Sequence, residues 1–287
     1  MGITHRAQAL LRRAARATAT AAGSDVTVTV DGIRYVVDRS DGGPGGALFE
    51  WRVLPEFGAL QRAVELLTAH GDSPVDSLLV DVGANIGTTC LTAVVRHDFN
   101  RALAIEPYSM NARLLRANAD LNGLADRVTV VEAAASDVEG ETTFAAGKAT
   151  TRGRHRSGAG TLRTDGVGSD VRVVTVDAEL RRRGISADDV GLLWADVQGH
   201  EARVALGAIG VVQQSRPFVF AARTGKLERK GDLETLATLV ETHYAHVIDL
   251  RDPTSRIEAA SSVRALLKPR ATTDILAFGS PTQGASG

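Results

Sequence analysis

The pattern of hydrophobic and polar residues predicts alternating strands and helices over most of the chain. From Leu78 onward, short apolar runs are separated by stretches in which apolar residues recur at helical spacing. The runs are SLLVDVG, ALAIEP, RVTVVEA, GLLWADV and PFVFAA, and the helical stretches begin near Thr88, Asn111, Glu201 and Asp232. Because such an alternation builds a parallel sheet with helices on both faces, the pattern predicts an α/β fold.

Two segments depart from this alternation. The last two apolar runs, AHVIDL and TDILAF, are separated only by a loop, which predicts an antiparallel pair at the edge of the sheet. Residues Glu141 to Val176 interrupt the alternation with TTF, the Gly/Arg-rich loop ATTRGRHRSGAGT and VRVVTV. A loop of that composition inside a compact domain is typically mobile or functional.

The N-terminal quarter of the chain has a pattern of its own. Residues 1–16 place arginines among alanines and leucines, which indicates a basic amphipathic helix, either solvated or docked on a partner or a membrane surface. Val26 to Asp38 alternates around Asp31-Gly32, which predicts a β-hairpin with a two-residue turn. A loop over Ser40 to Gly46 and a helix from Pro55 to about His70 follow.

These patterns divide the chain into three parts. Residues 1–75 form an N-terminal helix, hairpin and cap helix, and residues 76–279 form the main domain with an insertion at 141–176. The remaining residues, 280–287, are small and polar and are expected to form a flexible tail.

Composition limits the partners and the compartment. Lys+Arg at 33 against Asp+Glu at 34 leaves a formal net charge of -1, so no global field recruits nucleic acid or an anionic membrane. The single cysteine, Cys90, falls in an apolar helical stretch, where a buried thiol is expected. One cysteine cannot form an intramolecular disulfide, which fits a reducing cytosol, so a cytoplasmic protein is expected. The first sixteen residues lack the continuous apolar run of a secretory signal and are too interrupted to span a bilayer. A homo-oligomer is compatible with the sequence.

The segment VDVGANIGT, Val80 to Thr88, joins the first strand of the sheet to a helix. There the backbone can approach a ligand while the helix N-terminus faces it. The spacing D-x-G-x-N-x-G, over Asp81, Gly83, Asn85 and Gly87, lacks the third glycine of the dinucleotide fingerprint G-x-G-x-x-G. Asparagine tolerates left-handed dihedrals, which suits the middle position. The segment therefore predicts a cofactor loop.

Glu106 ends the second strand in AIEP, where its carboxylate can accept both hydroxyl hydrogens of a ribose. The alternative is a surface charge at the end of a strand. A ribose is common to NAD and S-adenosylmethionine. The missing glycine, the acidic Asp81 at the head of the loop and the antiparallel closing strands favour S-adenosylmethionine.

The chain resembles the FkbM family of S-adenosylmethionine-dependent methyltransferases in six segments. In order these are VDVGANIGTTCL, AIEPYSMNARLLRANADLNGL, VEAAASDVEGETTF, VRVVTVDAEL, LLWADVQGHEARVALGA and TDILAF. The resemblance extends from about Leu78 to Phe278 and implies a class I methyltransferase fold with a mostly parallel, Rossmann-like sheet. It also implies O-methylation of a small-molecule acceptor, a natural product or a sugar.

The resemblance implies a position for each part of S-adenosyl-L-methionine. It places the methionine end along the glycine loop, the ribose on Glu106, the adenine near Ala133 to Asp137, and Asp196 beside the reactive methyl. An open α/β sheet also binds its ligands at this edge. The implied cofactor residues are Asp81, Gly83, Ala84, Asn85, Gly87, Glu106, Ala133, Ala134, Ser136, Asp137 and Asp196.

Three positions depart from the family pattern. Where the pattern K-I-D-V-E-G-H-E is common, this chain has Trp194 for the lysine and Gln198 for the glutamate. Where many members carry a glutamate four residues after the proline of the next strand, it has Ala221. These departures bear on the acceptor and on turnover.

The polar residues of LLWADVQGHE are the candidates for catalysis. His200 is the first candidate for the base, because an ordinary histidine pKa near 6.5 is close to neutrality. Its alternative is to open a helix with Glu201, and for Glu201 we favour that structural role, since a carboxylate stabilises the positive helix end. Asp196 can orient the acceptor, hold the cofactor or accept the proton, or it can cap the helix. Gln198 can hydrogen-bond a substrate hydroxyl but cannot act as a base.

The sequence offers two further candidate sites, one for an anionic group of the substrate and one for a metal. The loop TTRGRHRSG can bind a phosphate or carboxylate of the substrate through Arg152, Arg154 or Arg156, or it can be merely solvated. The acidic and histidine side chains of LLWADVQGHE could ligate a divalent metal, but no second acidic cluster follows, so no metal is predicted.

Three functions follow from these observations. The leading one is S-adenosylmethionine-dependent O-methylation of a small-molecule hydroxyl. The second is an NAD-dependent oxidoreductase on the same sheet, and the third is a binding protein that keeps the fold without turnover. The absence of an N/D-P-P-Y motif after the fourth strand argues against nucleic-acid amino methyltransferases.

Overall fold

The structure is a computed structural model that describes residues 25–53, 56–147, 156–163, 165, 168–267 and 272–281. The basic helix expected at residues 1–16, the loop residues Arg152 and Arg154, and most of the expected tail lie outside these residues.

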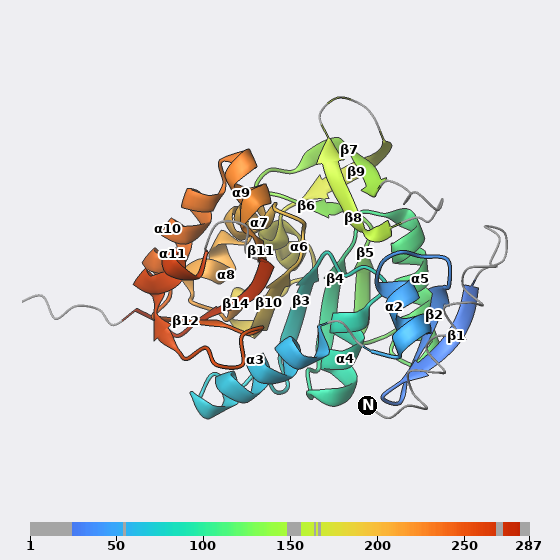
Figure 1. The fold of residues 1–287 in the computed structure, drawn as a ribbon, viewed down its shortest axis with the longest axis horizontal. Coiled ribbons are helices and arrows are strands. Elements are labelled where there is room, and N and C mark those ends of the chain that lie inside the picture. The colour runs from blue at the N-terminus through green and yellow to red at the C-terminus, as the bar shows by residue number, and fades with distance from the viewer. Residues whose placement is uncertain are drawn as a thin grey trace, which may run out of the picture.

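An eight-stranded sheet of the described residues forms the centre of the molecule (Figure 1). Its order is β13-β12-β14-β11-β10-β3-β4-β5. The parallel strands are β3 (Leu78–Val82), β4 (Arg101–Ile105), β5 (Val128–Val131), β10 (Val190–Ala195) and β11 (Phe218–Arg223). These are the five apolar runs of the sequence, and the α/β fold with a parallel sheet that they predicted is confirmed. The mostly parallel, Rossmann-like sheet of class I methyltransferases, which the resemblance implied, is confirmed as well.

Antiparallel strands complete the sheet beside β11. β14 (Thr272–Phe278) lies between β11 and β12 (His246–Asp249) and is antiparallel to both. The predicted antiparallel pair is therefore confirmed, but its connection is more than a loop. It contains the short strand β13 (Glu258–Ala259) and the helix α11 (Val263–Leu266).

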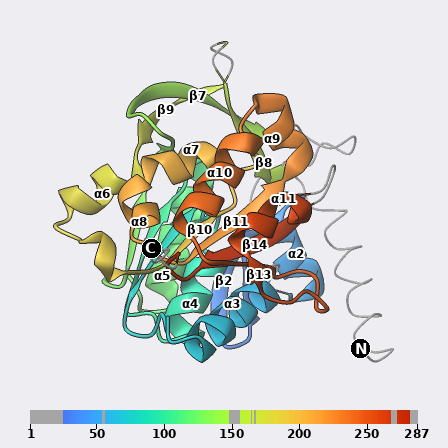
Figure 2. The ribbon, with the colours of Figure 1, turned by 90° about the vertical axis from the view of Figure 1, so that its left-hand side faces the viewer.

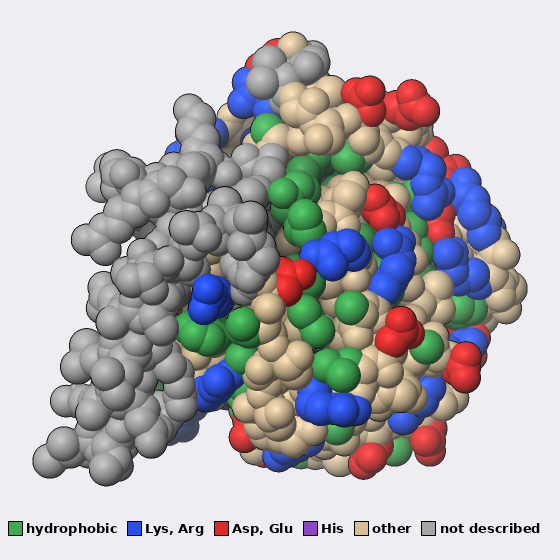
Figure 3. Space-filling model, turned by 90° about the vertical axis from the view of Figure 1, so that its right-hand side faces the viewer, with side chains coloured by type: hydrophobic (Ala, Val, Ile, Leu, Met, Phe, Trp, Pro, Cys, Tyr) green, Lys and Arg blue, Asp and Glu red, His purple; other side chains and the backbone are tan. Residues whose placement is uncertain are grey.

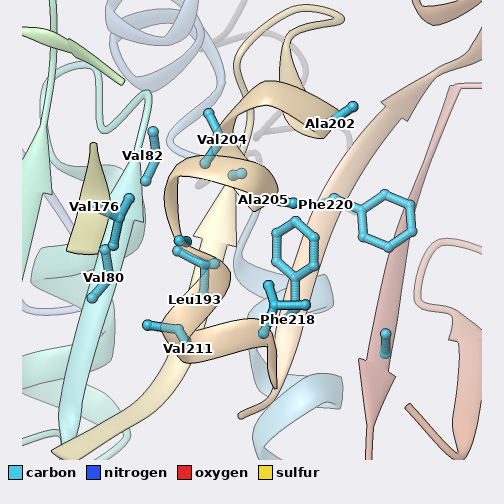
Figure 4. Close-up of a cluster of buried hydrophobic side chains, with 14 of the residues drawn as sticks. Val80, Val82, Val176, Leu193, Ala202, Val204, Ala205, Val211, Phe218 and Phe220 are labelled. Carbon is cyan, nitrogen blue, oxygen red and sulfur yellow. The ribbon is translucent and has the colours of Figure 1, made fainter. Parts of the chain in front are cut away.

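Helices cover both faces of the sheet because the strands are apolar on both sides. One face packs against α6 (Val176–Arg182), α7 (Glu201–Gly207), α8 (Ile209–Gln213) and α10 (Leu233–His243). The other packs against α3 (Phe57–Ala69), α4 (Thr88–Arg96), α5 (Ser109–Leu121) and the N-terminal hairpin. On the first face, Leu193, Phe218 and Phe220 of the sheet meet Val204 and Val211 (Figure 4). Cys90 is buried on the second face, as expected.

The N-terminal hairpin pairs β1 (Asp25–Val30) with β2 (Ile33–Asp38) through the predicted two-residue turn. The turn residues have φ angles of 50° and 82°, the left-handed values that a tight hairpin requires. The hairpin is fixed to α5, because the backbone N–H of Val36 donates to Asn118 Oδ1 at 2.6 Å.

The loop predicted over residues 40–46 is shorter than expected. A helix, α2 (Pro44–Trp51), begins inside it. Proline at the first helical position has the φ that a helix needs, and the carboxylate of Asp41 accepts the N–H groups of Gly43 and Gly45 at 2.9 and 3.1 Å. These two bonds supply the capping that the apolar pattern alone did not reveal.

The insertion contributes three of the four strands of a second sheet, in the order β6-β9-β7-β8. Its strands are β6 (Ala134–Ala135), β7 (Gly140–Gly147), β8 (Arg156–Arg163) and β9 (Ser169–Val174). Both ribbon views place it above the central sheet (Figures 1 and 2).

The surface agrees with the balanced charge of the chain. On the face drawn in Figure 3, acidic and basic side chains are interspersed. Among the described residues, no helix is both long enough and apolar enough to cross a membrane.

Candidate functional site

A cavity of about 330 Å³ lies at the carboxyl ends of the parallel strands. Its volume falls within the range of roughly 300 to 1,000 Å³ that is usual for small-molecule sites. Its centre is the switch point between β3 and β10, where the strand order reverses and open sheets bind their ligands. The N-terminal segment and the insertion also contribute to its wall, through Gly42, Gly43, Pro44, Glu56, Phe144, Gly160, Thr161 and Leu162.

The glycine loop after β3 adopts the backbone that its sequence requires. Gly83 has a φ of 83°, and a Cβ there would lie 2.3 Å from the carbonyl oxygen of Asp196. Only glycine therefore lets the loops after β3 and β10 touch. Asn85 has a φ of 52°, which confirms the left-handed conformation expected of it. Gly83, Ala84 and Asn85 all line the cavity.

Gly87 has a different place from the rest of the loop. With a φ of 91°, it is the residue that caps the N-terminus of α4, and it is absent from the described cavity wall. A Cβ there would meet the side chains of Leu91 and Leu115 at 3.2 Å. Gly87 therefore shapes the start of the helix and the packing of α4 on α5.

Two predicted acidic residues are buried on the cavity wall. Glu106 is 4 % exposed, and Asp81 is 2 % exposed. The Glu106 carboxylate accepts the N–H groups of Asn85 and Tyr108, at 2.9 and 3.0 Å, and the Asn111 amide at 3.2 Å. Burial raises the pKa of Glu106 to about 7. The alternative of a surface charge at the strand end is therefore wrong.

Asp81 joins the loop to the following helix. Its Oδ2 accepts the backbone N–H of Cys90 at 3.1 Å. Burial, followed by repulsion from Glu56, raises its pKa to about 8.

Glu56 is a site residue that the sequence did not reveal. It precedes α3 in the N-terminal segment, lines the cavity, and accepts a hydrogen bond from the Thr88 hydroxyl at 3.2 Å. Burial and the neighbouring Asp196 raise its pKa to about 7. Glu56 has no motif around it, so only the packing of α3 against α4 brings it to the cavity.

A chain of polar contacts occupies the end of β10. Arg223 donates to both carboxylate oxygens of Asp196 at 3.3 Å, and the Gln198 amide donates to Asp196 Oδ1 at 3.0 Å. The Gln198 Oε1 atom accepts from Lys226 at 2.8 Å. Asp196 and Gln198 line the cavity as predicted. The alternative role of Asp196 as a helix cap is wrong, because His200 occupies the N-cap position of α7.

His200 lines the cavity, and its Nε2 lies 3.0 Å from the Ser136 hydroxyl oxygen. That hydroxyl donates its single hydrogen to Asp137 at 2.8 Å, so Nε2 is the donor and Nδ1 carries the lone pair. Burial, followed by the charge of Lys230, lowers the pKa of His200 to about 4. The imidazole is thus neutral at neutral pH but is a weaker base than its ordinary pKa suggested.

Glu201 has a structural role, as we favoured, although a more buried one than expected. It is the first residue of α7 and is 0 % exposed. Its Oε1 accepts the N–H groups of Gly199 and Val197, at 2.9 and 3.3 Å, so the turn after β10 folds around this carboxylate.

The adenine residues implied by the resemblance divide into two groups. Ala134 lines the cavity together with its neighbour Ala135. The described wall does not include Ala133, Ser136 or Asp137. Ser136 instead contacts His200, and Asp137 forms an ion pair with Arg203 at 2.9 Å.

The departures from the family pattern have distinct surroundings. Trp194 is 2 % exposed and also contributes to the cavity wall. Ala221 pairs across the sheet with Asp274, so a carboxylate still lies on that face of the sheet, where it accepts from Arg251 at 2.7 Å. In the described part of the chain, no group of three or more acidic, histidine or cysteine side chains is arranged to hold a metal.

Comparison with known proteins gives a family match. The family model of the methyltransferase FkbM domain matches residues 81–261, which is more than half of the chain. No curated protein matches the sequence significantly.

Solved structures give distant matches. Methyltransferase FkbM from Methylobacillus flagellatus is 17% identical with a TM-score of 0.44, and the match covers 71% of this chain and 44% of that one. The chain thus spans less than half of that protein's length. TYW2 from M. jannaschii in complex with AdoMet is 10% identical with a TM-score of 0.44, covering 91% and 87% of the two chains. An RNA methyltransferase from Salinibacter ruber in complex with S-adenosyl-L-homocysteine is 13% identical with a TM-score of 0.32, covering 56% and 72%.

The family match extends from the glycine loop through the whole Asp196 turn, the two segments that meet at the cavity. The chain belongs to the FkbM family of S-adenosylmethionine-dependent methyltransferases.

Proposed function

We propose that the protein transfers a methyl group from S-adenosylmethionine to a hydroxyl oxygen of a small molecule. The observation that carries this proposal is that a single cavity is lined both by the glycine loop with Glu106 and by the hydrogen-bonded polar residues around Asp196. S-adenosylmethionine supplies a methyl group on a sulfonium, which an oxygen attacks in line while the sulfur leaves as a neutral thioether.

The acidic wall of the cavity fits a cationic nucleoside. Asp81, Glu106 and Glu56 are held by N–H and O–H donors, and no described Arg or Lys forms an ion pair with them. Burial without a cation is what raises their pKa values, so a ligand with positive charge relieves a cost that the free protein bears. The Oε2 atom of Glu106, which accepts only the Asn85 N–H, also keeps a lone pair for a ribose hydroxyl.

Asp196 is proposed to position the acceptor. Its carboxylate is fixed between Arg223 and Gln198, at the edge of the cavity and in contact, through its backbone, with the glycine loop. Holding two reactants in contact and aligned can supply about 7 to 11 kcal/mol of a barrier, which makes this role the larger contribution.

Glu56 is proposed to take the proton from the attacking hydroxyl. Unlike Asp196, it has no cationic partner among the described residues that would hold its charge. It faces the carboxyl groups of Asp196, Asp81 and Asp274, and the more distant charge of Arg251. A proton acceptor works best when its pKa lies near the working pH, and Glu56, at about 7, meets this condition better than His200, at about 4.

The test is to incubate the purified chain with S-adenosylmethionine and a panel of hydroxyl-bearing small molecules, and to measure S-adenosylhomocysteine and methylated product. The expected result is a methyl ether with at least one acceptor. Loss of the S-adenosylmethionine signal without any methylated oxygen, or methylation at nitrogen or carbon only, would overturn the proposal. Cofactor binding with no transfer across the panel would instead identify a binding protein on the same fold.

A further inference from the structure

We propose that the methyl acceptor carries an anionic group, a carboxylate or a phosphate, which binds to Lys226 and Lys230 of α9 (Thr224–Lys230). The inference rests on the proposed function and specifies the class of its substrate. The residues on which it is based lie on the side of the cavity away from the acidic wall.

Three cations follow one face of α9 and its N-cap. Arg223, Lys226 and Lys230 are spaced three and four residues apart, which puts them on the same side of the helix. Arg223 and Lys230 line the cavity, and Lys226 contacts Gln198, which also lines it. Two of the three cations thus line the cavity in which the acceptor is proposed to bind, and Lys226 is joined to its wall through Gln198.

The negative charges around these cations are nearly all engaged elsewhere. Asp196 pairs with Arg223 at 3.3 Å. Asp232 accepts from Arg203 at 3.0 Å, and Asp274 from Arg251 at 2.7 Å. The Oε1 atom of Glu201 accepts backbone N–H groups of the turn, whereas its buried Oε2 has no hydrogen-bond partner among the described residues. Glu201 is therefore the carboxylate whose charge still acts on both lysines, without a hydrogen bond to either.

Neither lysine forms an ion pair with a carboxylate of the described residues. Lys226 donates to the neutral Gln198 side chain, and Lys230 makes no hydrogen bond or ion pair within the part of the chain that the structure describes. Partial burial lowers the pKa of both lysines, and this loss of water outweighs the opposing charges of Glu201 and Asp196 on Lys226 and of Glu201 and Asp232 on Lys230. The Nε atom of Arg223, which is also buried without a partner, adds a third donor on the same side.

Because Gln198 is neutral, its contact with Lys226 leaves the positive charge of that lysine uncompensated. Its Oε1 lies 2.8 Å from the Lys226 ammonium. A glutamate at this position, as in the pattern D-V-E-G-H-E, would convert the contact into an ion pair and cancel one positive charge. With glutamine, that charge is available to a bound anion, since the amide is neutral.

The experiment is a calorimetric titration of the full chain, saturated with S-adenosylhomocysteine, with inorganic phosphate in one arm and acetate in the other. Ionic strength is held constant with sodium chloride, because surface charge effects are screened by salt. Saturable binding is expected in at least one arm, and the arm that binds identifies phosphate or carboxylate. The variants are Lys230→Gln, Lys226→Gln and Gln198→Glu, with Arg229→Gln as a matched control on the same helix but outside the described cavity wall.

A charge-assisted hydrogen bond is worth enough that Lys230→Gln and Lys226→Gln should each weaken anion binding about tenfold. Gln198→Glu is expected to weaken it by about threefold to tenfold, because the new carboxylate competes for Lys226. Arg229→Gln should leave it unchanged. No saturable binding of either anion by the loaded wild type, or an equal loss in Arg229→Gln, would overturn the inference. If the chain fails to bind S-adenosylhomocysteine at all, the proposed function fails first, and the two failures are thereby distinguished.

Discussion

The two sides of the cavity carry different kinds of titratable side chain, acidic on one side and basic on the other, although they lie at the ends of adjacent strands. The side after β3 and β4 carries Asp81 and Glu106, joined by Glu56 from the N-terminal segment, and none of the three has a cationic partner among the described residues. The side after β10 and β11 carries Lys230 and, through Gln198, Lys226 of α9, and neither lysine forms an ion pair among the described residues. The parallel sheet thus fixes where ligands bind, while the loops that follow each strand decide which charge a ligand must have.

The two sides also differ in how tightly they are built. On the acidic side, Glu106 is held by a backbone donor of the glycine loop, and Asp81 and Glu56 by donors of α4. The glycine loop can barely move without breaking the contact of Gly83 with Asp196. The basic side consists of long side chains on one helix. We therefore expect the acidic side to be preformed for a fixed cofactor and the basic side to adjust to an acceptor.

The largest effect is expected from Gly83→Ala, because it damages both sides at once. The new Cβ would lie 2.3 Å from the Asp196 carbonyl oxygen at a φ of 83°. Separating the two loops by about 1 Å should lower turnover by roughly 10²-fold or more and should also weaken cofactor binding. Steady-state kinetics and S-adenosylhomocysteine titration measure the two effects. Gly58→Ala, at a position with open space around it, is the control, and equal activity of both variants would contradict the account.

Asp196→Ala should affect turnover on the acceptor side without affecting cofactor binding on the acidic side. The variant removes the residue that positions the acceptor, so kcat/KM should fall by about 10²-fold while S-adenosylhomocysteine affinity changes by less than about threefold. His200→Ala should have the smaller effect on turnover, because the low pKa of His200 makes it a poor proton acceptor. A larger loss in His200→Ala than in Asp196→Ala would show that the roles are assigned wrongly.

Glu56→Gln should change the pH dependence of the reaction. In the wild type, kcat should rise as pH increases through about 7, because a protonated Glu56 cannot accept the acceptor proton. In the variant this rise should be absent, and the rate at pH 8 should fall by about tenfold to 10²-fold. The pH profiles of kcat measure the effect, with Glu65→Gln, an exposed residue of α3, as the control. An unchanged rise in Glu56→Gln would assign the titration to another group.

The smallest expected effect concerns stability. Burial raises the pKa of Asp81 from 3.8 to about 8, so its contribution to stability is complete below pH 3.8 and is lost as pH rises through about 8. The free protein should therefore unfold at a lower temperature at pH 8 than at pH 6. Asp81→Asn should reduce this difference by a few degrees, since about 1 kcal/mol shifts Tm by roughly 2 to 4 °C at this size. The measurement is the Tm of the wild type and of Asp81→Asn at pH 6 and at pH 8, and an equal pH difference in the two proteins would contradict the prediction.

The sequence predicted the sheet and the acidic side well because both depend on local patterns. Each parallel strand is a continuous apolar run, and Asp81, Gly83 and Asn85 lie within five residues of one another. Glu106 follows the adjacent strand directly, so its position at the same edge required no knowledge of tertiary packing.

The rest of the site depends on contacts between distant segments. Glu56 reaches the cavity only because α3 packs beside α4, and no residue near it in the sequence marks it as functional. Lys226 follows Gln198 by 28 residues, and their contact depends on the position of α9 over the end of β10. The pKa of His200 was also misjudged, since burial and the charge of Lys230 follow from packing.

The most direct test of the contrast between the two sides is calorimetric titration of S-adenosylhomocysteine into the wild type, Glu106→Ala and Lys230→Gln. Glu106→Ala removes the carboxylate that is proposed to bind the ribose, so it should weaken binding by about tenfold to 10²-fold. Lys230→Gln should bind like the wild type, because its lysine belongs to the acceptor side. Equal affinity of Glu106→Ala and the wild type, or an equal loss in both variants, would contradict the account.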